Sequence, residues 1–313
     1  MGNNTKIEWT EATWNPVAGC RWASPGCDHC YAARMTRRLE AMGHEKYTGL
    51  TTAKHFNGEV YLDKTALQIP LKRKKATTYF VDSMSDLFYE KVSFDFVDKV
   101  FAIMSLCPQH TFQVLTKRPE RMAEYVKSID ERSNTAEQTQ RGKTLHQWAY
   151  DSLGQEISRQ LIEHARAGWW EWLNRPNVWI GTSVENSDAL HRIDELRPVP
   201  AAVRFLSLEP LLEDLGPLDL AGIDWVIVGG ESGPHARPLH PDWALSIRDQ
   251  CQAARVPFFF KQWGLWKPVE YEAGHWPESH DRDTFPDGQQ LKRVGKQAAG
   301  RLLDGREWNE VPK

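Results

Sequence analysis

The chain has 313 residues, of which 41% are hydrophobic and 26% are charged, with a formal net charge of −3 at pH 7. This size accommodates one large α/β domain or two ordinary ones, and the small net charge excludes a protein drawn onto nucleic acid by its overall field. No run of about 18 apolar residues occurs, which excludes a transmembrane helix, and residues 1–16 lack the apolar core of a secretory signal. We therefore expect a cytoplasmic protein without membrane attachment, and the sequence leaves its oligomeric state open.

Short apolar runs alternate with helical patterns along most of the chain. A weak strand pattern over 12–20 precedes a predicted helix over 30–43, which Gly43 ends. The later runs are apolar throughout rather than alternating, which is typical of parallel strands buried on both faces. They cover 78–86, 111–118, 178–186, 203–210, 224–232 and 257–264, and the helical patterns between them cover 94–106, 120–129, 188–196 and 241–254.

This alternation predicts βαβ units and therefore a parallel sheet or barrel. We predict an α/β fold, a partial or full (β/α) barrel over residues 1–264. A polar segment at about 130–175 does not follow the rhythm and is predicted to be a helical insertion. Residues 265–313 are poor in apolar side chains and are predicted to form an extension packed on the barrel.

The predicted insertion combines cations with tryptophans, and two roles for it remain open. It could be a hairpin that docks on the barrel through its indoles. Alternatively, it could be an arm over the barrel mouth, in which cations bind phosphates and an indole stacks on a base. The residues concerned are Arg132, Arg141, Lys143, Arg159, Arg166, Arg175, Trp148, Trp169, Trp170 and Trp172.

Each predicted strand ends in polar or ionisable side chains. In β/α barrels the active site forms at the C-terminal ends of the strands, so these side chains predict a functional ring at one mouth of the barrel. Helix capping uses short side chains and leaves the long ones unexplained. The long ones are Lys117, Glu185, Glu209 and Lys261, and the other candidates are Ser83, Ser85, Asp86, Arg118, Ser183, Gly229, Gly230 and Glu231.

Three of the five cysteines stand close together, in GCRWASPGCDHCYAARM. In a reducing compartment, clustered cysteines are more often metal ligands or catalytic thiols than disulfides. Cys20, Cys27 and Cys30 have the spacing C-x6-C-x2-C, and three thiolates without an obvious fourth favour a 4Fe–4S cluster with one iron left open. The other two, Cys107 and Cys251, occur in helical and largely apolar surroundings and are predicted to be packing residues.

Two other interpretations of the three cysteines stay open. One is a zinc site in which His29, His44 or Asp28 supplies the fourth ligand. The other is a set of ordinary buried cysteines, although the polar sequence Cys-Asp-His-Cys offers no apolar face.

Three cysteines after the first strand, the ring of His29 just before the last of them and a β/α barrel together resemble the radical S-adenosylmethionine superfamily. More closely, the chain resembles an uncharacterised family of phage and bacterial proteins with a three-cysteine motif. The spore photoproduct lyase branch, which repairs DNA, is a more distant likeness. The matching stretches span nearly the whole chain outside the insertion and read TKIEWTEATWNPVAGC, SPGCDHCYA, FVDSMSDLF, HTFQVLTKRPERM, WIGTSVEN, FLSLEPLL, WVIVGGESG and GRLLDGREW.

The resemblance implies that the three cysteines hold three irons of a 4Fe–4S cluster, and that S-adenosylmethionine chelates the fourth for radical chemistry. The x6 loop is longer than the usual x3, and residues 82–86 (DSMSD) replace the usual Gly-Gly-Glu. By position and charge, the candidates for binding the cofactor are Ser83, Ser85 and Asp86 for its amino group, Ser183 and Glu185 for its ribose, Lys117 or Arg118 for its carboxylate, and Gly229, Gly230 and Glu231. The candidates for catalysis are Lys117, Glu209 and Lys261.

The leading interpretation is an iron–sulfur enzyme that uses S-adenosylmethionine, with a nucleic acid or nucleotide as the favoured substrate class. A base inside a duplex would have to be flipped out to reach a barrel mouth. Two other classes stay open. One is a non-catalytic metal-binding or partner-binding protein that keeps the barrel as a scaffold. The other is a zinc-dependent or carboxylate-pair hydrolase that uses Glu185 with Glu209 or Glu231.

Overall fold

The computed structural model describes residues 5–130, 136–166, 175–269 and 282–312. Its contacts divide the chain into two compact units. The first comprises Met1–Trp22, Ala32–Thr182 and Asp194–Arg204, and the second comprises Ala23–Tyr31, Ser183–Ile193 and Phe205–Lys313. The domain boundary predicted at residue 264 stays a prediction.

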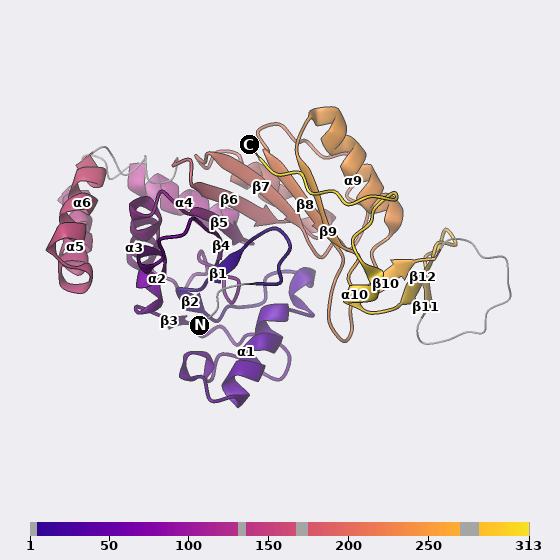
Figure 1. Cartoon of the computed structure of the whole chain (residues 1–313), viewed down its shortest axis with the longest axis horizontal. Helices are drawn as coiled ribbons and strands as arrows, with labels where there is room; N and C mark the ends of the chain where they lie inside the picture. Colours follow the sequence, from indigo (N-terminus) through magenta and orange to yellow (C-terminus); the bar gives the residue numbers. More distant parts are fainter. Residues whose placement is uncertain (1–4, 131–135, 167–174, 270–281, 313) are drawn as a thin grey trace. The chain divides into compact units, whose positions relative to one another are not determined.

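The fold is α/β, with a seven-stranded sheet in the order β1-β4-β5-β6-β7-β8-β9 (Figure 1). Strands β1 and β9 stand at the two ends of this order, which confirms the predicted barrel in its partial form. Every strand expected from an apolar run is present. The seven strands are β1 (Ala12–Trp14), β4 (Thr78–Val81), β5 (Thr111–Thr116), β6 (Val178–Ser183), β7 (Val203–Leu208), β8 (Trp225–Gly229) and β9 (Phe258–Gln262).

In the first unit, β1, β4, β5 and β6 pair in parallel. Aromatic rings fill the core beside them, with the ring centroids of Trp14 and Phe112 5.4 Å apart and those of Tyr79 and Phe112 5.6 Å apart. Helix α3 (Phe94–Leu106) is apolar nearly all round, which is typical of a buried helix, and most of its side chains are buried. The other elements of this unit are α1 (Tyr31–Ala41, whose first residue belongs to the second unit), β2 (Val17–Ala18), β3 (Tyr61–Leu62), α2 (Ile69–Lys72), α3 (Phe94–Leu106) and α4 (Pro119–Asp130).

The described part of the predicted insertion is helical and contains α5 (Ala136–Leu153) and α6 (Gln155–Arg166). The two helices meet at Gly154, whose φ of +93° is readily adopted only by glycine. Both helices contact α3, and the ring of Trp148 lies under the ammonium group of Lys99 on that helix. The insertion is therefore docked within its own unit. Arg132, Trp169, Trp170 and Trp172 lie outside the described residues, as do the side chains of Arg141 and Arg166.

In the second unit, β7, β8 and β9 pair in parallel, and α9 (Pro241–Ala254) connects β8 to β9. The extension forms a small antiparallel sheet of β10 (Trp266–Pro268), β12 (Gln290–Arg293) and β11 (Arg282–Thr284), followed by α10 (Lys296–Ala299). Its last residues run along the larger sheet, because Phe260 N–H donates to the carbonyl of Trp308 at 3.0 Å and Trp225 Nε1 donates to that of Glu310 at 2.8 Å. The last residues of the extension therefore pack on β8 and β9.

In the parts of the chain that the structure describes, no helix is both long and apolar enough to cross a membrane.

Candidate metal centre

The loop that carries Cys27 and Cys30 belongs to the second unit. Residues Pro25–Cys27 form a 3-10 turn, for which the fixed φ of proline is suited. The N–H of Cys27 donates to the carbonyl of Ser24 at 2.8 Å, and the N–H of Cys30 donates to that of Cys27 at 3.2 Å. The two thiols are therefore carried on one tight turn, and both are partly exposed.

A buried carboxylate just after β6 holds the start of this turn. Glu185 has a side chain that is 0% exposed. Its Oε1 accepts a hydrogen bond from the N–H of Gly26 at 3.3 Å, and its Oε2 accepts one from Arg192 Nη1 at 3.1 Å. Arg192 also donates to the carbonyl of Ser183 at 2.9 Å. A buried ion pair of this kind needs such additional hydrogen bonds to offset the loss of hydration.

A second carboxylate, just after β8, holds the other side of the turn. Glu231 accepts hydrogen bonds from Arg237 through the backbone N–H at 2.8 Å, through Nε at 2.9 Å and through Nη2 at 2.6 Å. His29 Nδ1 lies 2.9 Å from Glu231 Oε2, and Arg237 Nη2 donates to the carbonyl of Pro25 at 3.0 Å. Burial raises the pKa of Glu231, but hydrogen bonds from Arg237 and His29 outweigh it and leave that pKa below its ordinary value.

Glu209 and Lys261, two of the three predicted catalytic residues, lie together in the second unit. Lys261 Nζ lies 2.6 Å and 2.8 Å from the two carboxylate oxygens of Glu209, and Gln262 Nε2 donates to Oε1 at 3.3 Å. The side chains of Lys261 and Glu209 are only 12% and 17% exposed, respectively. The third predicted catalytic residue, Lys117, belongs to the first unit, where its N–H donates to Asp86 Oδ2 at 3.0 Å.

The Gly229-Gly230 pair has a packing explanation. A Cβ on Gly230 would lie 2.1 Å from the carbonyl oxygen of Trp263, so the backbone after β9 can approach only a glycine here. A Cβ on Gly229 would lie 3.3 Å from Glu209 Cδ. The two glycines therefore make room for neighbouring chain and for the Glu209 carboxylate.

In the first unit, the thiol of Cys20 lies beside a buried guanidinium. Arg118 Nη1 is 3.8 Å from Cys20 Sγ and 2.9 Å from Asp86 Oδ2, and Nη2 donates to the carbonyl of Arg21 at 3.2 Å. Burial lowers the pKa of Arg118, but the charges of Asp86 and Cys20 outweigh it and raise that pKa above its ordinary value. The guanidinium is therefore a permanent positive charge next to the first cysteine.

Asp82, the first residue of the run 82–86, is a buried carboxyl that the sequence analysis did not single out. This residue follows β4 with a φ of +57° and is 2% exposed. Burial raises its pKa to about 7, although Val17 N–H donates to its Oδ1 at 2.9 Å. Nearby, Ser83 Oγ donates to Asn15 Oδ1 at 3.1 Å, and Ser85 lies beside the Asp82 carboxyl.

Two further partners of these carboxylates were not predicted, namely Arg192 and Arg237. Arg192 and Arg237 hold the carboxylates of the cysteine turn, and Thr116 Oγ1 donates to Asp86 Oδ1 at 2.7 Å. Neither arginine stands at a strand end, and no periodic pattern marks it as the partner of a particular carboxylate. Thr116, in contrast, ends a predicted strand, so its position was a usable signal.

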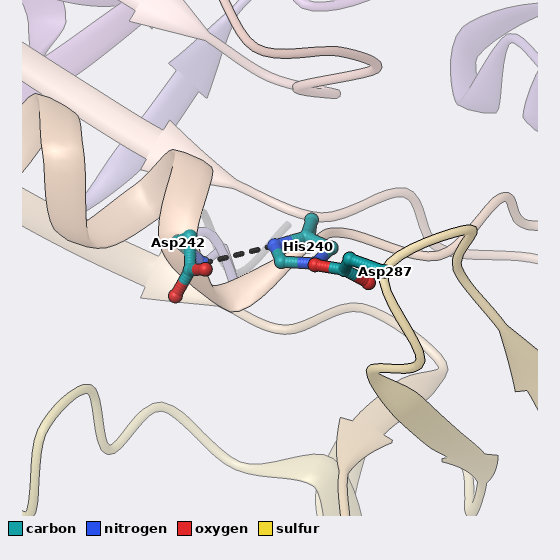
Figure 2. A group of neighbouring side chains, drawn as sticks. All are labelled: His240, Asp242 and Asp287. Carbon is teal, nitrogen blue, oxygen red and sulfur yellow. Dashed lines mark hydrogen bonds and ion pairs between the residues drawn. The ribbon is translucent and has the colours of Figure 1, made fainter.

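A separate cluster combines His240, Asp242 and Asp287, shown in Figure 2. In the described ranges it is the one group of three His, Cys, Asp or Glu side chains whose ligand atoms all lie within 4.8 Å of one another. The N–H of Asp242 donates to His240 Nδ1 at 3.1 Å, and His240 Nε2 lies 2.8 Å from Asp287 Oδ2. Because both ring nitrogens are used and the ring packs on Phe285 with centroids 4.6 Å apart, the cluster is explained as a dock for the extension on α9.

The fold and these networks define an α/β protein of the partial-barrel type, in which a cysteine turn is held by carboxylates that follow parallel strands. The chain belongs to the family described as protein of unknown function DUF5131, whose model matches residues 4–312. No curated protein matches the chain significantly.

Solved structures of spore photoproduct lyase are also similar to this chain. The complex with dinucleoside spore photoproduct is 10% identical with a TM-score of 0.38, and the match covers 95% of this chain and 72% of that one. A variant with bound AdoMet and dinucleoside spore photoproduct is 10% identical with a TM-score of 0.39, covering 93% and 70%. A variant with dinucleoside spore photoproduct alone is 9% identical with a TM-score of 0.40, covering 95% and 71%.

Proposed function

We propose that this chain is an iron–sulfur enzyme in which Cys20, Cys27 and Cys30 bind a 4Fe–4S cluster and the strand ends bind S-adenosylmethionine. The observation that carries the proposal is the cysteine turn held by Glu185 and Glu231, each of which follows a parallel strand. Barrels of this class place their active sites at the C-terminal ends of the strands. Two buried carboxylates orient this one short turn. Such support favours a functional role for the turn over that of a simple connection.

The donor set suits such a cluster. The five cysteines are all free thiols, and they fall into two groups. Burial raises the pKa of Cys107 and of Cys251 to about 12, which opposes the thiolate form that a metal needs. The other three are partly exposed. Soft thiolates are the ligands that iron–sulfur clusters select.

When bound, the cluster and S-adenosylmethionine would supply a 5′-deoxyadenosyl radical. The residues of this chain would hold and orient the reactants. Glu231 remains ionised at neutral pH and sets the orientation of His29 within the turn. The partly buried Glu209–Lys261 pair supplies a matched negative and positive group for a substrate. For the cofactor itself, the proposed contacts at the remaining strand ends are Ser83, Ser85, Asp86, Ser183, Gly229 and Gly230.

A nucleic acid or nucleotide is the proposed substrate class. Trp22 stands two positions after Cys20 and is 46% exposed, and it directly follows the exposed Arg21. An exposed indole beside a cation is the combination that stacks on a base while neutralising its phosphate. Replacement of Trp22 by Ala should therefore weaken binding of a short single-stranded oligonucleotide, and replacement of the exposed Tyr150 on the insertion should not.

Zinc is the second candidate for the metal, because of one observation. The Nδ1 of His29 lies against the Glu231 carboxylate, and a carboxylate behind a histidine is the usual support for a zinc ligand. On this alternative, the other ring nitrogen of His29 completes a site of three cysteines and one histidine.

Anaerobic purification followed by reconstitution with iron and sulfide tests the proposal. We expect about four irons and four sulfides per chain, and 5′-deoxyadenosine release when S-adenosylmethionine and a reductant are added. Cys27→Ala and Cys30→Ala should lose the iron, while Cys107→Ala and Cys251→Ala should keep it. Equal iron in the wild type and in Cys27→Ala refutes the cluster, and stoichiometric zinc that resists iron reconstitution favours the second candidate.

A further inference from the structure

In the first unit, the guanidinium of Arg118 lies beside the sulfur of Cys20. Arg118 is 6% exposed, and its Nη1 lies 3.8 Å from Cys20 Sγ. In the second unit, Arg237 donates to the carbonyl of Pro25 on the cysteine turn. Arg192 donates to Glu185, one of the carboxylates that hold this turn. Cys20 is therefore a proposed ligand with a buried cation against its sulfur.

The orientation of Arg118 is fixed by its partners. Asp86 binds Nη1 at 2.9 Å, the carbonyl of Arg21 binds Nη2 at 3.2 Å, and Glu90 lies 3.5 Å from Nε. The ring of Tyr89 stacks on the guanidinium, whose central carbon lies 4.9 Å from the ring centroid. Each edge of the planar fork is used, so the side chain cannot turn toward another ligand without breaking several of these contacts.

Asp86, which anchors the guanidinium, is fixed in turn. Its Oδ1 accepts from Thr116 Oγ1 at 2.7 Å and from the N–H of Phe88 at 3.0 Å. Its Oδ2 accepts from the N–H of Lys117 at 3.0 Å and from Arg118. All four bonds come from the end of β5, from the two residues that follow it, or from the loop after β4. The sheet itself therefore determines where the positive charge lies.

We propose that Arg118 is a positioning residue for Cys20 that donates a charge-assisted N–H···S hydrogen bond to its metal-bound sulfur and raises the reduction potential of the cluster. This inference rests on the proposed function. Hydrogen bonds to ligand sulfurs and a nearby positive charge both favour the reduced cluster, which carries one more negative charge. The chain would thus tune the electron transfer that starts its reaction through the sulfur of Cys20.

The test is a redox titration, monitored by EPR, that gives the midpoint potential of the reconstituted cluster without S-adenosylmethionine. Arg118→Met removes the charge and the donor, and Arg118→Lys keeps the charge without the planar fork. Arg121→Met is the matched control, because Arg121 stacks on Phe94 at 4.5 Å and donates to backbone carbonyls in the same unit. We expect at least a tenfold shift of the reduction equilibrium in Arg118→Met, about 59 mV toward lower potential, an intermediate shift in Arg118→Lys, and none in Arg121→Met.

The outcomes separate this inference from the proposed function. An unchanged potential in Arg118→Met with full iron overturns the inference and leaves the cluster standing. A lower affinity for S-adenosylmethionine in Arg118→Lys with an unchanged potential also overturns it, because Arg118 then binds the cofactor instead. If Arg118→Met loses iron at an unchanged melting temperature, the positioning role is supported. The midpoint potential is then measured on Arg118→Lys instead. A wild-type chain that takes up no cluster refutes both.

Discussion

His29 Nδ1 lies 2.9 Å from Oε2 of Glu231, and the two residues are 202 positions apart in the chain. His29 stands between the two cysteines of the turn, and Glu231 follows the end of β8. A carboxylate just beyond the end of β8 thus orients a ring on the cysteine loop, and Arg237 adds three hydrogen bonds to the same carboxylate. The position of the turn is set by the sheet rather than by the loop's own sequence.

Glu231→Gln should loosen the cysteine turn. The variant keeps the size of the side chain but loses the charge that Arg237 and His29 share. Because hydrogen bonds to a charged group contribute about 1.5–3 kcal/mol, we expect the free energy of unfolding to fall by about 2 kcal/mol, together with lower iron content after reconstitution. Urea denaturation and metal analysis measure the two effects.

Asp287→Asn is the control for this variant, since it also removes a carboxylate that faces a histidine but lies on the surface of the extension. It should leave stability nearly unchanged. The pKa of Glu231 is held below its ordinary value of 4.5, so its stabilising effect is present above that pH and disappears on acidification. A difference between wild type and Glu231→Gln that does not shrink as the pH falls below 4.5 contradicts this account.

Asp82→Asn should stabilise the protein at neutral and alkaline pH. Burial raises the pKa of Asp82 from 3.8 to about 7, so the folded chain binds a proton there that the unfolded chain releases above about pH 4. Stability from this group is therefore complete in acid and is lost as the pH rises toward 7. Asparagine keeps the acceptor for Val17 and tolerates positive φ.

The measurement for Asp82 is the free energy of unfolding of both proteins at pH 4 and pH 8. The gain at pH 8 should reach up to about 4 kcal/mol, from roughly three pKa units at 1.36 kcal/mol each, and should be small at pH 4. Ser83→Ala, one position away, should show no pH-dependent difference. A gain of equal size at both pH values would show that backbone strain rather than the buried charge is responsible.

Glu209 and Lys261 should be energetically coupled. Glu209→Gln and Lys261→Met each leave a partly buried charge with fewer partners, so each should destabilise by about 1–3 kcal/mol. The double variant should cost less than the sum, with a coupling energy of about 1–2 kcal/mol. Lys117→Met, in the other unit, should add independently. If either single variant instead raises the melting temperature, the pair is strained for binding a substrate rather than serving stability.

His240→Ala should detach the extension from α9. It removes the acceptor for the N–H of Asp242 at the helix start and the ring that packs on Phe285. Loss of such a cap costs about 1–2 kcal/mol, and proteolysis should then cut the extension faster. Added zinc should not raise the melting temperature of the wild type through this cluster, since both ring nitrogens are already used. A zinc-dependent increase that His240→Ala abolishes would make it a metal site.

The sequence alone determined the order and type of the seven strands of the larger sheet and of the main helices between them. Helices α3 and α9 have the predicted bounds, 94–106 and 241–254. Both can be recognised locally, because a helical apolar pattern has a proline at or just beyond one end. Strand ends were less accurate. The run predicted over 78–86 ends as β4 at Val81, because Asp82 turns the backbone to positive φ.

The tertiary structure alone decided which charges meet. The polar residues at strand ends were predictable, because they directly follow the apolar runs that mark the strands. The partners of those residues were not, because Arg192, Arg237 and Arg118 reach them from loops and helix starts whose paths depend on packing of the whole unit. Hydrophobic periodicity is a local signal, whereas an ion pair such as Arg118–Asp86 forms only after distant segments have been brought together by burial of the apolar core.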